Sequence, residues 1–178
     1  MEITEVDVKL HQSHDRLRAF CAVVFDDCFV VKDVKVLERS DGSLLLSMPD
    51  RELADRCPFC KSQTPYKYVR CGKCGAQLAP DREPVDPDTG RTIRYACVAY
   101  PLNMDYRREM ERRIFSAYRL AVEFEDDSIR SCAGCGRPLD LFDVVNLRDI
   151  CLADVGGTRE LYCAGACWAA VRADVEVA

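Results

Sequence analysis

Residues 95–124 read YACVAYPLNMDYRREMERRIFSAYRLAVEF, and this stretch determines the fold of the chain. Residues 95–100 have the character of a strand, which Pro101 ends because proline has no N–H for a sheet. Asn103 is then placed to cap a helix. On the helical period, one side carries Tyr106, Met110, Ile114, Ala117 and Ala121, and the opposite side carries Arg108, Arg112 and Arg119. We expect one long amphipathic helix that packs on a sheet.

Four segments before this stretch predict the strands of that sheet. They alternate between apolar and polar residues, and they span residues 1–10, 17–25, 29–37 and 44–48. Asp26-Asp27 is one turn candidate, and the hairpin signal Ser40-Asp41-Gly42-Ser43 is another. With residues 95–100 as the last strand, the pattern predicts an α+β fold: an antiparallel meander capped by one long C-terminal amphipathic helix, plus two small zinc-binding modules.

Changes in composition divide the chain into three parts. We assign residues 1–49 and 91–127 to the core, 50–90 to an inserted four-cysteine zinc ribbon or knuckle, and 128–178 to a C-terminal finger. The Pro/Asp-rich residues 80–90 have the composition of a linker.

The inserted segment carries the spacing C-x2-C-x10-C-x2-C. Its ligand candidates are Cys57, Cys60, Cys71 and Cys74. Two such turns aim four soft thiolates at one point, and a closed shell leaves no position for a reactive water. We predict a structural zinc site; the alternative is a redox dithiol in Cys57-Pro58-Phe59-Cys60.

A second set of cysteines predicts a second structural zinc. Its members are Cys132, Cys135, Cys163 and Cys167, with Cys151 as a competing ligand. A knuckle, a hairpin and a final pair at a helix start loosely resemble the treble-clef-like TRASH/MYM-type fingers. The acidic character of this module favours a protein partner. We expect Cys21, Cys28 and Cys97 to be buried as small hydrophobic residues.

Charge is distributed unevenly. A net charge of −5 argues against a uniformly basic nucleic-acid binder, so such a role requires local patches. Residues 56–78 contain no acid; their basic and aromatic residues are Arg56, Lys61, Lys67, Arg70, Lys73, Phe59, Tyr66 and Tyr68. This mixture suits phosphate contact and base stacking, or it balances the charge of the zinc thiolates. The helix arginines could likewise bind a polyanion or pair with Glu109, Glu111 and Glu123.

Several classes of protein are disfavoured. We find no phosphate-binding loop, nucleophile elbow, dinucleotide turn or deaminase signature, so we expect no enzymatic activity. The acidic N-terminus is unlike a signal peptide, and the apolar runs are too short to span a bilayer. We expect a cytoplasmic protein that could associate with the nucleoid.

The core resembles the SpoVG (stage V sporulation protein G, septation regulator) family. The resemblance is carried by residues 1–8, 29–36, 95–103 and the segment from Asp41-Gly42 to Met48-Pro49. It implies a homodimeric α+β protein that binds DNA and RNA and regulates transcription, with links to septation and sporulation. The implied contact residues are Arg94, Arg107, Arg108, Arg112 and Arg113.

The chain departs from that family by its two cysteine modules. Roughly forty residues replace the short basic loop that family members carry, and they add Lys67, Arg70 and Lys73 to the candidate contacts. Our leading hypothesis is a nucleic-acid-binding regulator with two structural zincs. The alternative is a zinc-stabilised protein–protein adaptor whose nucleic-acid surface is vestigial.

Overall fold

The structure is a computed structural model that describes residues 1–12, 15–126 and 130–175. It is a mixed α/β structure with antiparallel sheets. The chain divides into two compact units: Met1–Ser47 with Pro101–Ala178, and Met48–Tyr100. Within the described residues, no helix has the length and apolar composition that a bilayer crossing requires.

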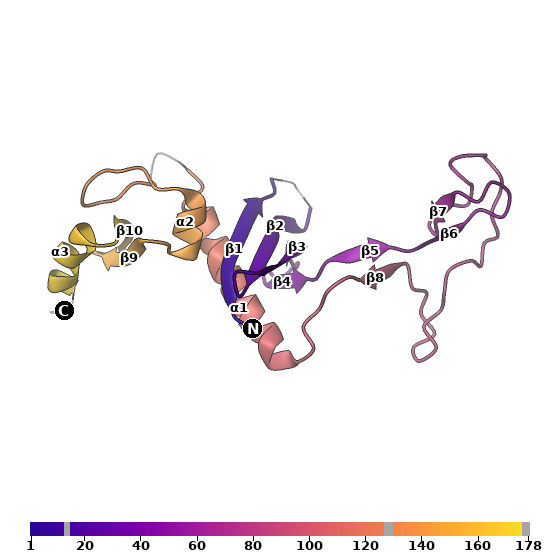
Figure 1. The fold of residues 1–178 in the computed structure, drawn as a ribbon, viewed down its shortest axis with the longest axis horizontal. Coiled ribbons are helices and arrows are strands. Elements are labelled where there is room, and N and C mark those ends of the chain that lie inside the picture. The colour runs from indigo at the N-terminus through magenta and orange to yellow at the C-terminus, as the bar shows by residue number, and fades with distance from the viewer. Residues whose placement is uncertain (13–14, 127–129, 176–178) are drawn as a thin grey trace. The chain divides into compact units, whose positions relative to one another are not determined.

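The first unit is built on a four-stranded antiparallel sheet (Figure 1). Its strands, in spatial order, are β1 (Ile3–Leu10), β2 (Leu17–Phe25), β3 (Phe29–Glu38) and β4 (Leu44–Ser47). These bounds agree with the four predicted strands to within two residues. Both turns form where expected: Asp26 and Asp27 have φ of 48° and 53°, and Gly42 has φ of 81°, the left-handed region that tight hairpin turns require.

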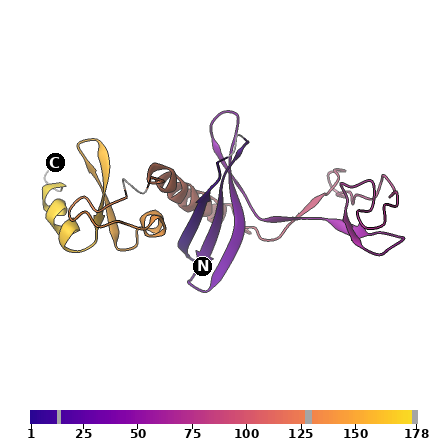
Figure 2. The same cartoon turned by 90° about the horizontal axis from the view of Figure 1, so that it is seen from above.

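Helix α1 (Met104–Glu123) covers one face of this sheet (Figures 1 and 2). The Asn103 side chain accepts a hydrogen bond from the Tyr106 amide at 2.7 Å, which confirms the predicted N-cap. The side chains that α1 buries are Met110, Ile114, Ala117, Leu120 and Ala121. Alternate strand residues face them, such as Val6, Cys21, Val23, Val34 and Val36. Four of the five residues of the predicted apolar stripe therefore lie in the core, whereas Tyr106 is only partly buried and Leu120 adds to the stripe.

The fold prediction of one long helix was wrong, because the described residues form two further, shorter helices. After α1, the first unit continues through α2 (Leu141–Asn146), the hairpin of β9 (Ile150–Val155) and β10 (Thr158–Cys163), and α3 (Ala166–Val175). We call residues 130–175 the C-terminal module. Helix α2, capped by Asp140, has only six residues, too few for a helical period to show in the sequence. The predicted boundary at residues 127–128 lies outside the described residues.

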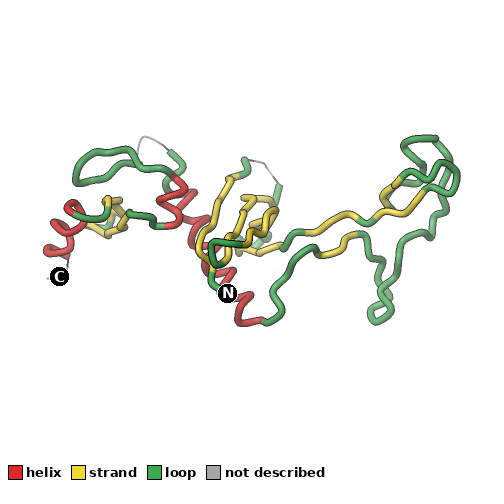
Figure 3. Tube along the Cα trace, in the orientation of Figure 1, coloured by secondary structure: helices red, strands yellow, loops and turns green. Residues whose placement is uncertain are grey.

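The second unit contains two short strand pairs. Strand β5 (Asp50–Glu52) pairs with β8 (Tyr95–Cys97), and β6 (Ala54–Arg56) pairs with β7 (Gln63–Pro65); Figure 3 marks them as short strands. We expected residues 95–100 to join the sheet of the core, and this was wrong. Because β5 follows directly after Pro49, it offers β8 an antiparallel partner as the chain returns from the insertion.

Two smaller expectations are also corrected. Residues 80–90 form a closed loop rather than a plain linker: Val85 bridges Thr92, and the Asp86 carboxylate accepts from the amides of Asp88 and Thr89. Cys21 is buried, and burial raises the pKa of its thiol to about 12. Cys28 and Cys97 are exposed, because one lies at the β2–β3 turn and the other on the two-stranded ribbon.

Candidate metal centres and nucleic-acid interface

The four cysteines of the inserted segment converge on one point. The sulfur atoms of Cys57, Cys60, Cys71 and Cys74 all lie within 4.8 Å of one another. The Sγ atoms are 3.7 Å apart for Cys57 and Cys74 and 3.6 Å apart for Cys60 and Cys71. Each of these close contacts joins a cysteine of the first C-x2-C turn to a cysteine of the second. The cluster is positioned to hold a metal ion.

The backbone of each C-x2-C turn explains this convergence. In the first turn the Lys61 amide donates to the Cys57 carbonyl, and in the second the Gly75 amide donates to the Cys71 carbonyl, both at 2.9 Å. The residue after each second cysteine is left-handed, with φ of 62° at Lys61 and 71° at Gly75. Glycine adopts this conformation freely, whereas lysine does so at a steric cost of about 1 kcal/mol.

Two hydroxyl groups that the sequence analysis missed support the thiolates. The Ser62 Oγ lies 3.0 Å from the Cys60 sulfur and 3.2 Å from that of Cys71, and Thr64 donates to Cys71. The Ser62 hydroxyl, helped by backbone amides, lowers the pKa of Cys71 to about 5. These groups orient the ligands from outside the tetrad.

The second tetrad forms in the C-terminal module. The sulfurs of Cys132, Cys135, Cys163 and Cys167 also lie within 4.8 Å of one another. In the described part of the chain, the Cys151 sulfur does not join this group, so the competing-ligand alternative is not favoured. The first cysteine turn, the β9–β10 hairpin and α3 occur in the predicted order, but the unexpected α2 lies between the turn and the hairpin.

Close packing holds this second tetrad together. A Cβ on Gly134 would lie 3.0 Å from the Cys167 Cβ, so glycine lets the first turn approach the start of α3. Contact with the neighbouring sulfurs, first that of Cys163, raises the pKa of Cys167 to about 12. Four thiolates this close repel one another, and a bound cation removes that repulsion.

The basic residues of the insertion differ in their partners. Lys67 pairs with Glu52 at 3.0 Å and lies over the Tyr68 ring, and Arg94, from beyond residues 56–78, pairs with Glu83 at 2.8 Å. Among the described residues, the side chains of Arg70 and Lys73 form no ion pair. Both line a shallow pocket that also includes Gln63 and Tyr68. The pocket thus combines unpaired positive charge with an aromatic ring.

Most candidate arginines on α1 are already paired. Arg107 contacts Glu111 at 3.0 Å and donates to the Leu46 carbonyl, Arg108 contacts Asp105 at 3.1 Å, and Arg112 contacts Glu109 at 2.9 Å. Within the described ranges, Arg113 forms no ion pair. Of the pairs that the sequence left open, Glu111 pairs at i,i+4 and Glu109 at i,i+3, whereas Glu123 pairs instead with Arg159.

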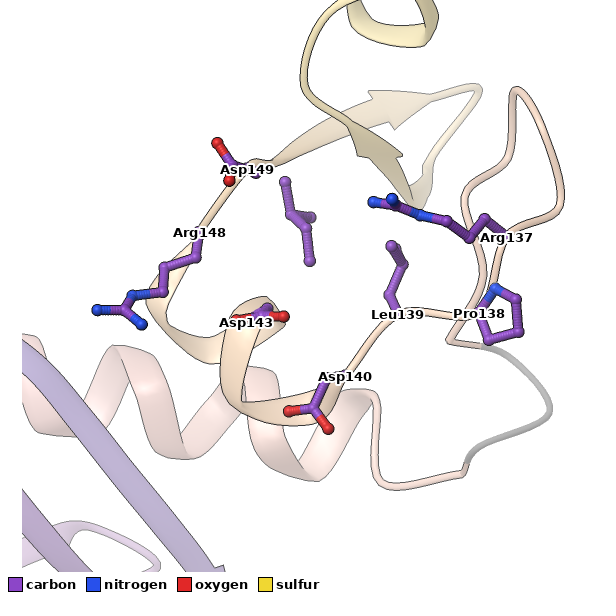
Figure 4. Close-up of a pocket in the computed structure, with 8 residues that line it drawn as sticks. Arg137, Pro138, Leu139, Asp140, Asp143, Arg148 and Asp149 are labelled. Atoms are coloured by element: carbon purple, nitrogen blue, oxygen red, sulfur yellow. The ribbon is translucent and has the colours of Figure 1, made fainter.

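A further pocket lies in the C-terminal module (Figure 4). Its wall includes two arginines and three aspartates, but several of these groups have structural partners. Asp140 caps α2 by accepting from the Phe142 amide, and Arg148 pairs with Glu5 and lies over the Phe142 ring. Two of the five charged side chains of the wall, Asp140 and Arg148, therefore already have structural roles.

Comparison with known proteins identifies relatives of the core. A family model described as SpoVG matches residues 1–120. A septation protein SpoVG of Clostridium botulinum (strain Alaska E43 / Type E3) is 29% identical over 126 residues, covering 71% of this chain and 97% of the relative. A protein of the same name from Treponema denticola is 46% identical over 55 residues, covering 31% of this chain and 58% of the relative.

Proposed function

The chain belongs to the SpoVG family, and from this premise we propose that it is a nucleic-acid-binding regulatory protein whose inserted module makes the principal contacts. In this proposal Arg70 and Lys73 contact phosphates, and Tyr68 stacks on a base. Lys67 lies over the Tyr68 ring but is paired with Glu52, so it contributes less. Arg94 and the α1 arginines 107, 108, 112 and 113 contribute less, since most of them are already paired with acids.

One observation carries the proposal: the unpaired guanidinium of Arg70 and ammonium of Lys73 share a pocket with an exposed aromatic ring, within the described residues. If Arg70 and Lys73 only balanced the negative charge of the cysteine thiolates, they would need no aromatic neighbour. A single-stranded nucleic acid offers both groups that this pocket could bind, a phosphate and a base face.

We infer that both tetrads hold Zn2+. Four thiolates at a metal–sulfur distance of about 2.3 Å form a tetrahedron with sulfur–sulfur edges of about 3.8 Å. The measured 3.6 and 3.7 Å in the first tetrad, and 3.4 and 3.7 Å in the second, are close to this value. Zinc bound by four thiolates has a structural role, because no coordination position remains for substrate.

The remaining parts of the proposal follow from the family and the surface. We propose a cytoplasmic homodimer with a binding rather than catalytic role. The large exposed apolar side chains Phe29, Leu102 and Met104 offer area for self-association. Native mass spectrometry tests this, and a monomer at micromolar concentration would contradict it.

The test is the salt dependence of nucleic-acid affinity. Fluorescence anisotropy is measured with labelled single-stranded DNA, duplex DNA and RNA for the wild type, for Arg70→Ala with Lys73→Ala, and for Arg108→Ala with Arg112→Ala. We expect the first double variant to reduce the log–log salt slope by about 2 and the second to change it less.

Each other outcome has a definite meaning. If the helix variant alone reduces the slope, the principal contact lies on α1 and the assignment to the insertion is wrong. If the wild type binds no nucleic acid at low salt, the adaptor function is favoured. Pull-downs that depend on residues 128–178 and survive nuclease treatment would then support that alternative.

A further inference from the structure

Strand β1 is one edge of the four-stranded sheet. An edge strand presents a row of backbone N–H and C=O groups that can pair with another strand. In β1 the Val6 amide and carbonyl point outward, away from β2, since both are bonded to a group outside the sheet. From Glu5 to Leu10 the pairing with β2 is regular, so the outward direction alternates with period two and the backbone groups of Val8 face the same side as those of Val6.

The group that covers this edge is the side chain of Asn146, at the end of α2. Its Oδ1 accepts from the Val6 amide at 2.7 Å, and its Nδ2 donates to the Val6 carbonyl at 2.9 Å. A side-chain amide has the same donor and acceptor as a peptide group, so Asn146 occupies the position of a paired strand. Asn146 is one of two buried polar residues in the described chain, with 9% of its surface exposed.

Neighbouring contacts fix α2 against this edge. Val144 and Val145 are fully buried, and the Asn146 Nδ2 also donates to the Phe142 carbonyl within α2. Arg148 forms an ion pair with Glu5 of β1, and Figure 4 shows its side chain pointing away from the pocket of this module. The hydrogen bonds to Val6 are thus surrounded by apolar packing and an ion pair.

The metal-ligand cysteines hold both ends of the segment that contains α2. Cys135 precedes it and Cys163 follows it, and the two sulfurs lie 3.7 Å apart. The Ala164 amide, next to Cys163, donates to the Asp149 carbonyl at 2.7 Å, just after α2. In a module this small, the tetrad closes the loop that presents Asn146.

We propose that the C-terminal module is a metal-dependent cap on the β1 edge. With its tetrad loaded, the module keeps Asn146 on Val6 and prevents strand addition; when the metal is lost, the edge opens to β1 of a second copy. The proposal goes beyond nucleic-acid binding and rests on the proposed metal loading of the second tetrad.

The sequence of β1 makes a second copy a suitable occupant. In an antiparallel pair with Val8 opposite Val8, Asp7 of each strand faces Lys9 of the other. This register thus forms two opposite-charge pairs on one face of the added strand, and it uses the same outward edge that Asn146 covers.

The test combines amide exchange with a strand probe. Exchange of the Val6 amide is followed by NMR in the zinc-loaded wild type, in Asn146→Ala and after chelation. A labelled peptide of residues 2–11 is titrated against the same samples. We expect Val6 exchange to accelerate by about ten-fold or more in the variant and after chelation. The peptide should bind both opened forms and not the zinc-loaded wild type.

Matched variants distinguish the loss of the Asn146 contact from a general loss of stability. Asn103→Ala removes an asparagine cap from α1 and should leave Val6 exchange and peptide binding close to wild type, relative to Asn146→Ala. Asn146→Asp keeps an acceptor for the Val6 amide but places a carboxylate against the Val6 carbonyl, so it should open the edge even if the alanine variant misfolds. Native mass spectra report how much metal each variant holds.

The contrary results are distinct from failure of the proposed function. Unchanged Val6 exchange in both Asn146 variants would overturn the cap, and so would peptide binding that is equal in all samples. A protected Val6 amide after complete chelation would overturn its metal dependence. Neither readout involves nucleic acid, and a C-terminal tetrad that takes up no metal is recognised directly in the mass spectrum.

Discussion

At the scale of single residues, the first metal centre depends on more than its four ligands. The Ser62 hydroxyl reaches the sulfurs of Cys60 and Cys71, and it lowers the pKa of both thiols. This favours the deprotonated form that binds metal, because a metal ion competes with protons for each sulfur. We therefore expect Ser62 to support metal retention without being a ligand.

We expect Ser62→Ala to weaken metal retention. Loss of an outer-shell hydrogen bond reduces metal affinity by about ten-fold or more. The stabilisation that comes from the lowered pKa of Cys71 is complete above the ordinary pKa of 9.0 and is lost as pH falls through about 5, so the defect should appear as earlier release on acidification. Competition with a chromophoric chelator from pH 8 to pH 5 measures it. Ser62→Thr should restore retention, and equal retention by the alanine variant would contradict the role of the hydroxyl.

Tyr68 is the second residue whose role can be tested alone. Its side chain is half exposed at the pocket that Arg70 and Lys73 line. We expect Tyr68→Ala to weaken single-stranded nucleic-acid binding by about 1 to 3 kcal/mol, through loss of base stacking, with little change in salt slope. Anisotropy titrations measure both quantities. Tyr100→Ala removes another exposed tyrosine of the same unit and should bind like the wild type.

At the scale of elements, the two sides of α1 have different roles. Its buried side packs on the sheet, and its exposed side carries arginines that pair with acids of the same helix. Such exposed pairs contribute little to stability, so the helix is held chiefly by burial and by its N-terminal cap. The cap therefore offers a clean test of the helix.

Asn103→Ala should lower the free energy of unfolding of the first unit by about 1 kcal/mol. The Tyr106 amide would lose the acceptor that now lies 2.7 Å away. Urea denaturation of the metal-loaded protein, monitored by the far-UV circular dichroism signal of its helices, measures this change. Asn103→Ser retains a capping oxygen and should cost less; equal losses in the two variants would mean that the cap contributes nothing.

At the scale of the whole molecule, the two tetrads belong to different compact units. Each tetrad draws its ligands from a short segment with a small buried cluster, for example Cys57, Cys71 and Leu78 in the insertion. Modules of this size depend on metal for much of their folding free energy, whereas the sheet and α1 have an apolar core of their own. The two sites should therefore respond independently to ligand loss.

We expect two metal ions per chain by native mass spectrometry. Cys57→Ser and Cys132→Ser should each retain one ion, and the double variant none, because each substitution opens one thiolate shell. Complete chelation should increase amide exchange in residues 50–78 and 130–163 and leave the inner strands β2 and β3 protected. Loss of both ions from either single variant would show that the tetrads are coupled.

The sequence by itself determined the local features of this protein. The β-strand alternation, the α1 stripe, the Asn103 cap and the two cysteine sets all follow from spacing along a short stretch, because side-chain direction repeats with the period of each element. Only the tertiary structure decided which distant groups meet. It paired β8 with β5, brought Ser62 to the Cys71 sulfur and placed Asn146 on Val6, 140 residues away. These partners depend on how packed elements approach one another in space, which no local periodicity encodes.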